Sequence, residues 1–194
     1  MKKDHLLPFI FEKHPIKGSI VILSDSWHRV LLNHDYPPVI NKLLGELLVC
    51  STLLASALKF DGSFTIQIQG SGPIQMLIAE CSSKLQVRAT ATLKKDHTFD
   101  NENSSLLHLV EKGNLSIELN PRKSGKSYQS IIPIIGDSVA EVFEHYLKQS
   151  EQIGSKLKLY ASKDVVGGLI LQKMERAHPH VLDTQTLLPL EQQR

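Results

Sequence analysis

The chain has 194 residues, of which 41% are hydrophobic and 22% are charged. These proportions are typical of a folded globular protein and argue against a wholly disordered chain, and the length fits a single domain. Lysine and arginine number 22 against 20 aspartates and glutamates, which gives a formal net charge of +2. This balance excludes the dense basic field of a dedicated nucleic-acid-binding protein.

The cysteines and the N-terminus indicate a reducing compartment. Cys50 and Cys81 lie far apart in the sequence, outside any zinc-binding spacing, so we expect two reduced, buried thiols. The basic N-terminus reaches Glu12 and Lys13 before any apolar core of secretory length, which predicts no signal peptide. The longest charge-free apolar helical segment, residues 47–58, is shorter than the roughly 20 residues of a membrane span. We therefore expect a soluble, cytoplasmic protein with no membrane partner.

The sequence pattern of the first third of the chain predicts a strand followed by helices. After an irregular opening, residues 19–23 form a β-branched run typical of a buried strand, and residues 25–33 fit a turn of helix. A helix is predicted after Pro37 and Pro38, across residues 39–60. Its apolar side chains occupy most of its circumference, which indicates burial in a core or between subunits.

The remaining elements are mostly strands, with two short helices. Alternation or a short apolar run predicts strands at residues 64–69, 74–81, 85–93, 115–119, 128–135, 157–161 and 165–174. Pro133 favours an edge strand. One helix is predicted at residues 106–112 with Gly113 as its C-cap, and another after the capping box of Ser138 and Glu141. Because strands come in runs with helices placed irregularly between them, we predict an α+β fold.

The segment at residues 122–127 ends like a phosphate-binding loop, with Gly125, Lys126 and Ser127. A P-loop also needs a glycine at the position of Asn120 and a helix after the loop. Here a strand pattern follows instead, so we predict a solvated loop and no nucleotide site.

No catalytic, cofactor or metal residues are predicted. Ser24, Asp25 and His28 lie close in sequence but lack a nucleophile elbow. His178 and His180 fit two exposed histidines better than a metal site. Glu141 and Glu144 fit solvated or capping side chains better than paired catalytic acids. The protein is therefore not expected to be an enzyme.

A series of segments occurs in a characteristic order, at residues 44–47, 53–62, 66–73, 87–89, 113–115, 128–129, 136–138, 146, 149–152 and 167–172. Together they closely resemble the heat shock protein 33 family, the redox-regulated holdase chaperones of the bacterial cytoplasm. The resemblance covers almost all of residues 9–174. Ser130 departs from the glycine that the family usually has at this place.

The resemblance implies an α+β fold of mixed or antiparallel sheets packed with helices, like the N-terminal domain of the family. It implies an ATP-independent holdase that binds unfolding or oxidatively damaged client proteins, and a homodimer. Residues 1–174 would form the chaperone core, and residues 175–194 the start of a linker or tail. Leu187, Leu188 and Leu190 in this tail are weak candidates for client contact.

The family's C-terminal zinc module, with its Cys-x-Cys and Cys-x-x-Cys switch, has no counterpart here, because Cys50 and Cys81 do not match those positions. We expect either a truncated chain or a gene without the switch. Zinc is expected only if a C-terminal cysteine domain exists in the full-length protein. We accordingly expect client binding that does not depend on oxidant.

A second class of function stays open. The basic loop at residues 122–126, together with Lys156 and Lys158, could bind RNA or an acidic partner. RNA binding is disfavoured because the loop lacks interleaved aromatic side chains, on which single-stranded bases stack.

Overall fold

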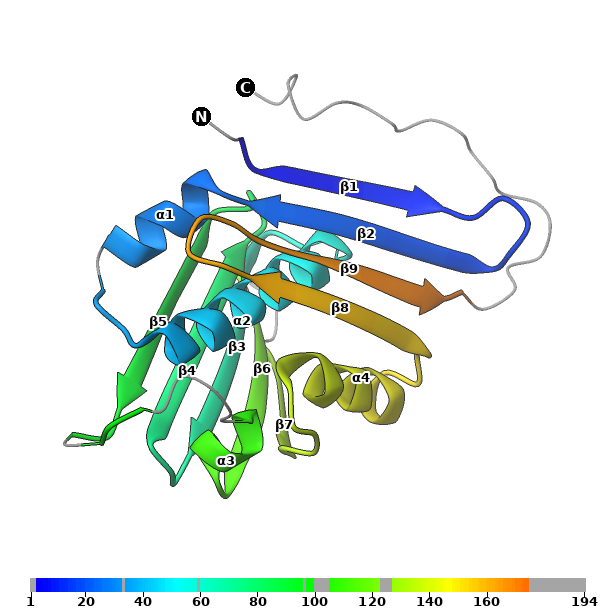
Figure 1. Ribbon diagram of the computed structural model, residues 1–194. Coiled ribbons are helices and arrows are strands. Elements are labelled where there is room, and N and C mark those ends of the chain that lie inside the picture. The colour runs from blue at the N-terminus through cyan, green and yellow to red at the C-terminus, as the bar shows by residue number, and fades with distance from the viewer. Residues whose placement is uncertain are drawn as a thin grey trace.

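In the computed structural model, one long helix lies between two antiparallel β-sheets (Figure 1). The structure describes residues 3–32, 34–58, 60–95, 97–99, 105–122 and 127–174. Helix α2 (Pro38–Ser56) packs against strands of both sheets and forms the middle layer. All strand pairs in the described part of the chain are antiparallel. The α+β fold predicted from the sequence is confirmed.

The first sheet has four strands and joins the two ends of the described chain. Its order is β1 (His5–Ile10), β2 (Ile16–Leu23), β9 (Val166–Lys173) and β8 (Ser155–Ala161). Residues far apart in sequence are therefore neighbours, and Ile20 of β2 lies opposite Leu169 of β9. The inward side chains of this sheet, such as Val21 and Ile170, are buried against the core.

The second sheet has five strands and lies on the other side of α2. Its order is β5 (Val87–Leu93), β4 (Ile74–Ser82), β3 (Gly62–Gly70), β6 (Gly113–Pro121) and β7 (Tyr128–Pro133). Strand β7 is an edge strand, as Pro133 predicted. Ile66 and Ile68 of β3 point inward and are fully buried.

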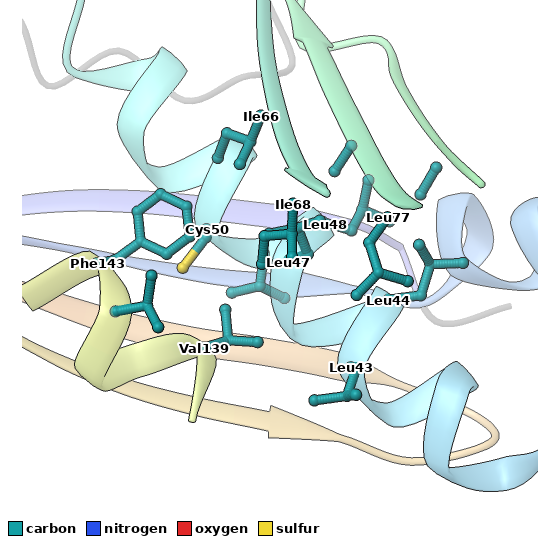
Figure 2. Packing of buried hydrophobic residues seen from close by; sticks show 14 of the residues in the cluster. Leu43, Leu44, Leu47, Leu48, Cys50, Ile66, Ile68, Leu77, Val139 and Phe143 are labelled. Carbon is teal, nitrogen blue, oxygen red and sulfur yellow. The ribbon is translucent and has the colours of Figure 1, made fainter. Parts of the chain in front are cut away.

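Helix α2 is the centre of the core, which explains why it is apolar on nearly every side. Leu44 and Leu48 lie toward the strands of the five-stranded sheet, whereas Leu47 and Cys50 lie toward Phe143 (Figure 2). By length and composition α2 could cross a membrane, but most of it is buried inside the fold, as in the core helices of soluble proteins. The predicted burial is confirmed, although the helix ends at Ser56 and does not continue to residue 60.

Three shorter helices complete the fold: α1 (Asp25–Leu32), α3 (Leu106–Val110) and α4 (Val139–Ser150). Helix α4 packs beside α2 and against β8 (Figure 1). Its predicted cap is present, because the Glu141 N–H donates to Ser138 Oγ. The Glu141 carboxylate accepts from the N–H of Asp137, one residue before the N-cap. Its apolar stripe is buried as predicted, comprising Val139, Val142, Phe143, Tyr146 and Leu147.

Three sequence predictions were wrong. The opening was predicted to be irregular, but it forms the strand β1. The pattern did not indicate a strand because the segment contains Pro8 and none of its residues is buried. Gly113 is not a C-cap: Glu111 takes the positive φ of 57° after α3, and Gly113 begins β6. A Cβ at Gly113 would lie 2.5 Å from the Gln69 carbonyl oxygen, so the glycine permits close strand packing. The strand predicted at residues 85–93 begins only at Val87, because Leu85 has a φ of 57° and lies before β5.

Candidate interaction surface

The four-stranded sheet has one face that no helix among the described residues covers. Its inward side chains point toward α2, and in Figure 1 none of the labelled helices lies on the opposite side of the sheet. Directly opposed residues of antiparallel strands share a face, so the register defines the outward set. This set comprises His5, Leu7, Phe9, Ile16, Gly18, Ile20, Ile22, Lys156, Lys158, Tyr160, Gly167, Leu169, Leu171 and Lys173.

Most of these outward residues are apolar, and several are well exposed. Leu7 is 58% exposed, Ile20 38%, Ile22 43% and Tyr160 60%. We define the apolar face as Leu7, Phe9, Ile20, Ile22, Tyr160, Leu169 and Leu171. Leu7, Ile20 and Leu169 form one continuous row across three strands. Contiguous exposed apolar residues on a soluble domain mark an interaction site.

Phe9 extends the apolar face because a glycine lies opposite it. A Cβ at Gly18 would lie 2.4 Å from Phe9 Cζ and 2.9 Å from the carbonyl oxygen of Ile170. No side chain fits between the Phe9 ring and β2. The absence of a side chain at Gly18 therefore lets the ring lie over β2, and Leu171 of β9 pairs with Gly18 from the other side.

The outward face of the five-stranded sheet is different in chemistry. Outward positions on β3 are Thr65, Gln67 and Gln69. Their neighbours on β6 are Glu118, Ser116 and Asn114, and those on β4 are Glu80 and the half-buried Ile78 and Met76. Side-chain hydrogen bonds link these strands, as from Gln129 Nε2 to Glu118 Oε1 at 2.8 Å. Ile131 is an exposed exception, on the edge strand β7. The contrast singles out the four-stranded sheet as the surface suited to apolar partners.

Two sheet edges are occupied by side chains from neighbouring elements. Tyr36 Oη accepts a hydrogen bond from the N–H of Ala91 on β5 at 3.0 Å and lies 3.0 Å from the carbonyl oxygen of the same residue. Glu144 Oε1 accepts from the N–H of Leu157 on β8 at 2.8 Å. The other two edge strands each contain a proline, Pro8 in β1 and Pro133 in β7. Such features oppose the addition of a further strand at these edges.

The structure does not assemble the Ser24, Asp25 and His28 group into a catalytic site. Ser24 Oγ donates to the backbone carbonyl of Asp164 at 3.4 Å. His28 Nε2 lies 4.0 Å from the Asp164 carboxylate. Asp4, the residue before β1, anchors the start of α1, because its carboxylate accepts hydrogen bonds from the Ser24 and Ser26 N–H groups. These contacts place the group in a helix-capping arrangement.

Strand β7 begins at Tyr128, directly after the loop with phosphate-binding character. A strand therefore follows that loop, as predicted, where a P-loop would have a helix. Residues 123–126 lie outside the described residues, as do His178 and His180 and the candidate client contacts Leu187, Leu188 and Leu190. RNA or acidic-partner binding by the 122–126 loop stays a prediction, as does the boundary between residues 174 and 175.

Both cysteines are buried free thiols, as predicted. Burial raises the pKa of Cys81 to about 12 and raises the pKa of Cys50 well above its ordinary value. Within the described ranges, no group of three histidine, cysteine, aspartate or glutamate side chains could hold a metal ion. Cys50 and Cys81 therefore do not fit the family's zinc centre. Glu141 acts in capping, as the sequence indicated, whereas Glu144 makes a contact with the edge of β8 that was not predicted.

The sequence pattern did not predict the exposed apolar face. Ile20 and Ile22 lie among other β-branched residues, so their run indicated a strand buried on both faces. The signal that could have revealed exposure is Pro8, since it marks β1 as an edge strand whose neighbour β2 lies near the border of the sheet.

Comparison with known proteins decides the family. A sequence model described as Hsp33 protein matches residues 4–192. The chain belongs to the Hsp33 family. It is 40% identical over 172 residues to the 33 kDa chaperonin of Methylobacillus flagellatus, covering 88% of this chain and 57% of that protein. It is 36% identical over 176 residues to the 33 kDa chaperonin of Pectobacterium carotovorum, covering 89% and 60%.

A solved structure supports the fold of this Hsp33 chain. The crystal structure of the 33 kDa chaperonin of Thermotoga maritima superposes with a TM-score of 0.78 at 22% sequence identity, covering 90% of this chain and 62% of that one. The chain thus spans about 57–60% of the length of these two curated relatives.

Proposed function

We propose that this protein is an ATP-independent holdase chaperone, which binds unfolding proteins and prevents their aggregation. The observation that carries the proposal is the apolar face of the four-stranded sheet. Unfolding proteins expose apolar side chains, and burying them against Leu7, Ile20 and Ile22 would be favourable by about 25 cal/mol per Å² before the costs of ordering. A holdase needs no chemical step, and no catalytic residues are predicted from the sequence.

Membership of the Hsp33 family supports the proposal, because the related proteins are named 33 kDa chaperonin. The clients would be unfolded or oxidatively damaged proteins of the bacterial cytoplasm. Since Cys50 and Cys81 do not fit a zinc centre, we propose that residues 1–194 work without zinc, nucleotide or another cofactor. Redox regulation would need cysteines other than the buried Cys50 and Cys81.

The test is the light scattering of a urea-denatured client diluted into buffer with the full chain. We expect aggregation to be suppressed by the wild-type chain, and suppression to be weakened severalfold in the double variant Ile20→Gln, Ile22→Gln. The matched control is Ile131→Gln, which removes a similarly exposed isoleucine from the five-stranded sheet. Circular dichroism would show that all variants are folded. Equal suppression by both variants would contradict the role of the apolar face.

We also propose that the protein forms a homodimer, as the family resemblance implies. Multi-angle light scattering at two concentrations would give about twice the 21.7 kDa of one chain. A mass of a single chain at both concentrations would contradict the proposal, and it would leave client binding to be judged by the aggregation assay.

A further inference from the structure

We propose that the apolar face selects client segments in which acidic side chains border the apolar ones. This inference rests on the proposed chaperone function and names the chemistry of its partner. It comes from three lysines that belong to the same outward set of the four-stranded sheet, namely Lys156, Lys158 and Lys173.

Each of these lysines lies directly opposite an apolar residue on the neighbouring strand. Lys158 of β8 is opposite Leu169, and Lys156 is opposite Leu171. Lys173 of β9 is opposite Ile16 of β2. Side chains in such pairs have Cβ atoms about 5 Å apart and share a face. When a client segment covers Leu169 and Leu171, the side chains that flank its apolar residues therefore lie beside the lysine ammonium groups.

The charge of this border is not balanced within the face. The outward set contains no aspartate or glutamate among its described members. Outside the outward set, Glu144 lies on α4 at the edge of β8, pairs with Lys156 Nζ at 2.7 Å and also interacts electrostatically with Lys158. Lys158 and Lys173 are both exposed on the sheet. The lysine border, defined as Lys156, Lys158 and Lys173, is thus complementary to carboxylates.

The edge contacts decide how such a segment binds. Glu144 occupies the Leu157 N–H on the edge strand β8, and the other edge strand, β1, contains Pro8, so adding a strand to the four-stranded sheet is opposed. A client must instead lie across the face and contact it through side chains. Affinity then depends on which side chains the client presents, and charge complementarity adds selectivity to a surface that is otherwise generally apolar.

The test uses three fluorescent peptides of 20 residues with identical apolar positions, whose remaining positions are all Glu, all Gln or all Lys. Fluorescence anisotropy with the full chain would measure their dissociation constants. We expect the order Glu tighter than Gln tighter than Lys, with the Glu and Lys peptides differing roughly tenfold at low salt. The difference should shrink in 0.5 M NaCl, because exposed charges are screened.

A charge-reversal variant, Lys158→Glu with Lys173→Glu, should reverse the order of the Glu and Lys peptides. The control, Lys84→Glu with Lys148→Glu, changes the net charge equally at exposed sites away from the apolar face and should keep the wild-type order. Reversal by the control as well would overturn the lysine border in favour of overall charge. Equal affinity for all three peptides would overturn the charge selection and leave the chaperone proposal standing. Failure of every peptide to bind would overturn both.

Discussion

Two glycines set the distance between α2 and the four-stranded sheet. A Cβ at Gly168 of β9 would lie 2.6 Å from Val49 Cγ1 and 2.9 Å from the Lys158 carbonyl oxygen. A Cβ at Gly45 of α2 would lie 2.7 Å from Val166 Cγ1. Both positions face the contact between α2 and the sheet, so the helix can approach the strands closely only because side chains are absent there.

We expect Gly168→Val to destabilise the fold by about 1–3 kcal/mol, because the added atoms overlap packed neighbours. The measurement is the free energy of unfolding in urea. Gly154→Ala is the matched control, since its Cβ would meet nothing closer than Lys173 Cβ at 3.9 Å. The control should change the stability by less than about 1 kcal/mol. A Gly168→Val variant as stable as the wild type would contradict the close packing.

The thiol of Cys81 links stability to alkaline pH. Burial raises its pKa to about 12 from an ordinary value of 9.0. The folded chain therefore keeps a proton on Cys81 that the unfolded chain loses above pH 9. Stability from this group is complete below pH 9 and is lost as the pH rises toward 12, at up to about 1.4 kcal/mol per pH unit.

We accordingly expect Cys81→Ala to reduce the loss of stability between pH 9 and pH 11, although the variant is less stable at pH 7 because of lost packing. Urea unfolding at several pH values would measure this slope. Met76→Ala on the same strand removes a side chain that does not titrate, so its slope should equal that of the wild type. Identical slopes for all three proteins would show that Cys81 does not contribute.

At the scale of elements, Glu144 joins α4 to the edge of β8. Partial burial opposes its ionisation, but hydrogen bonds from the Leu157 N–H and from Lys156 lower its pKa overall. A carboxyl group with a lowered pKa stabilises the fold above its unfolded pKa, near 4.5. That contribution is lost as the pH falls through the folded pKa.

Glu144→Ala should cost about 1–2 kcal/mol at pH 7, because the Leu157 N–H loses its acceptor. The difference from the wild type should narrow as the pH falls below 4.5. Lys156→Ala is the control: it removes the exposed ion pair and leaves the edge contact, so it should cost less than about 1 kcal/mol. Thermal unfolding at pH 3 to 7 would measure both. Equal losses for the two variants would contradict the importance of the edge contact.

The elements that the sequence predicted well are those whose pattern follows from burial on one side. The stripe of Val139, Val142 and Phe143 and the alternation of Phe64 and Ile66 each indicated one buried face, and the structure buries them. Strand β1 could not be found this way, because none of its residues is buried. Its place depends on pairing with β2, a contact that no local pattern records.

At the scale of the whole molecule, the apolar face required the pairing of distant segments. Leu7, Ile20 and Leu169 come from three separate parts of the chain, and they form one row only once β1 and β9 pair with β2. The resemblance to the Hsp33 family indicated a chaperone, but it did not indicate which surface is apolar and exposed. The candidate contacts chosen instead, Leu187, Leu188 and Leu190, lie outside the described residues.

The last prediction concerns oxidants. The reactive form of cysteine is the thiolate, and burial with a raised pKa keeps Cys50 and Cys81 as inaccessible thiols. We therefore expect this chain to suppress client aggregation equally in hydrogen peroxide and in reductant. Thiol titration should find both cysteines intact after peroxide treatment, and reactive once urea unfolds the chain. A strong increase of the suppression in peroxide would contradict this prediction, and loss of either thiol in the folded protein would show that the oxidant reaches the buried cysteines.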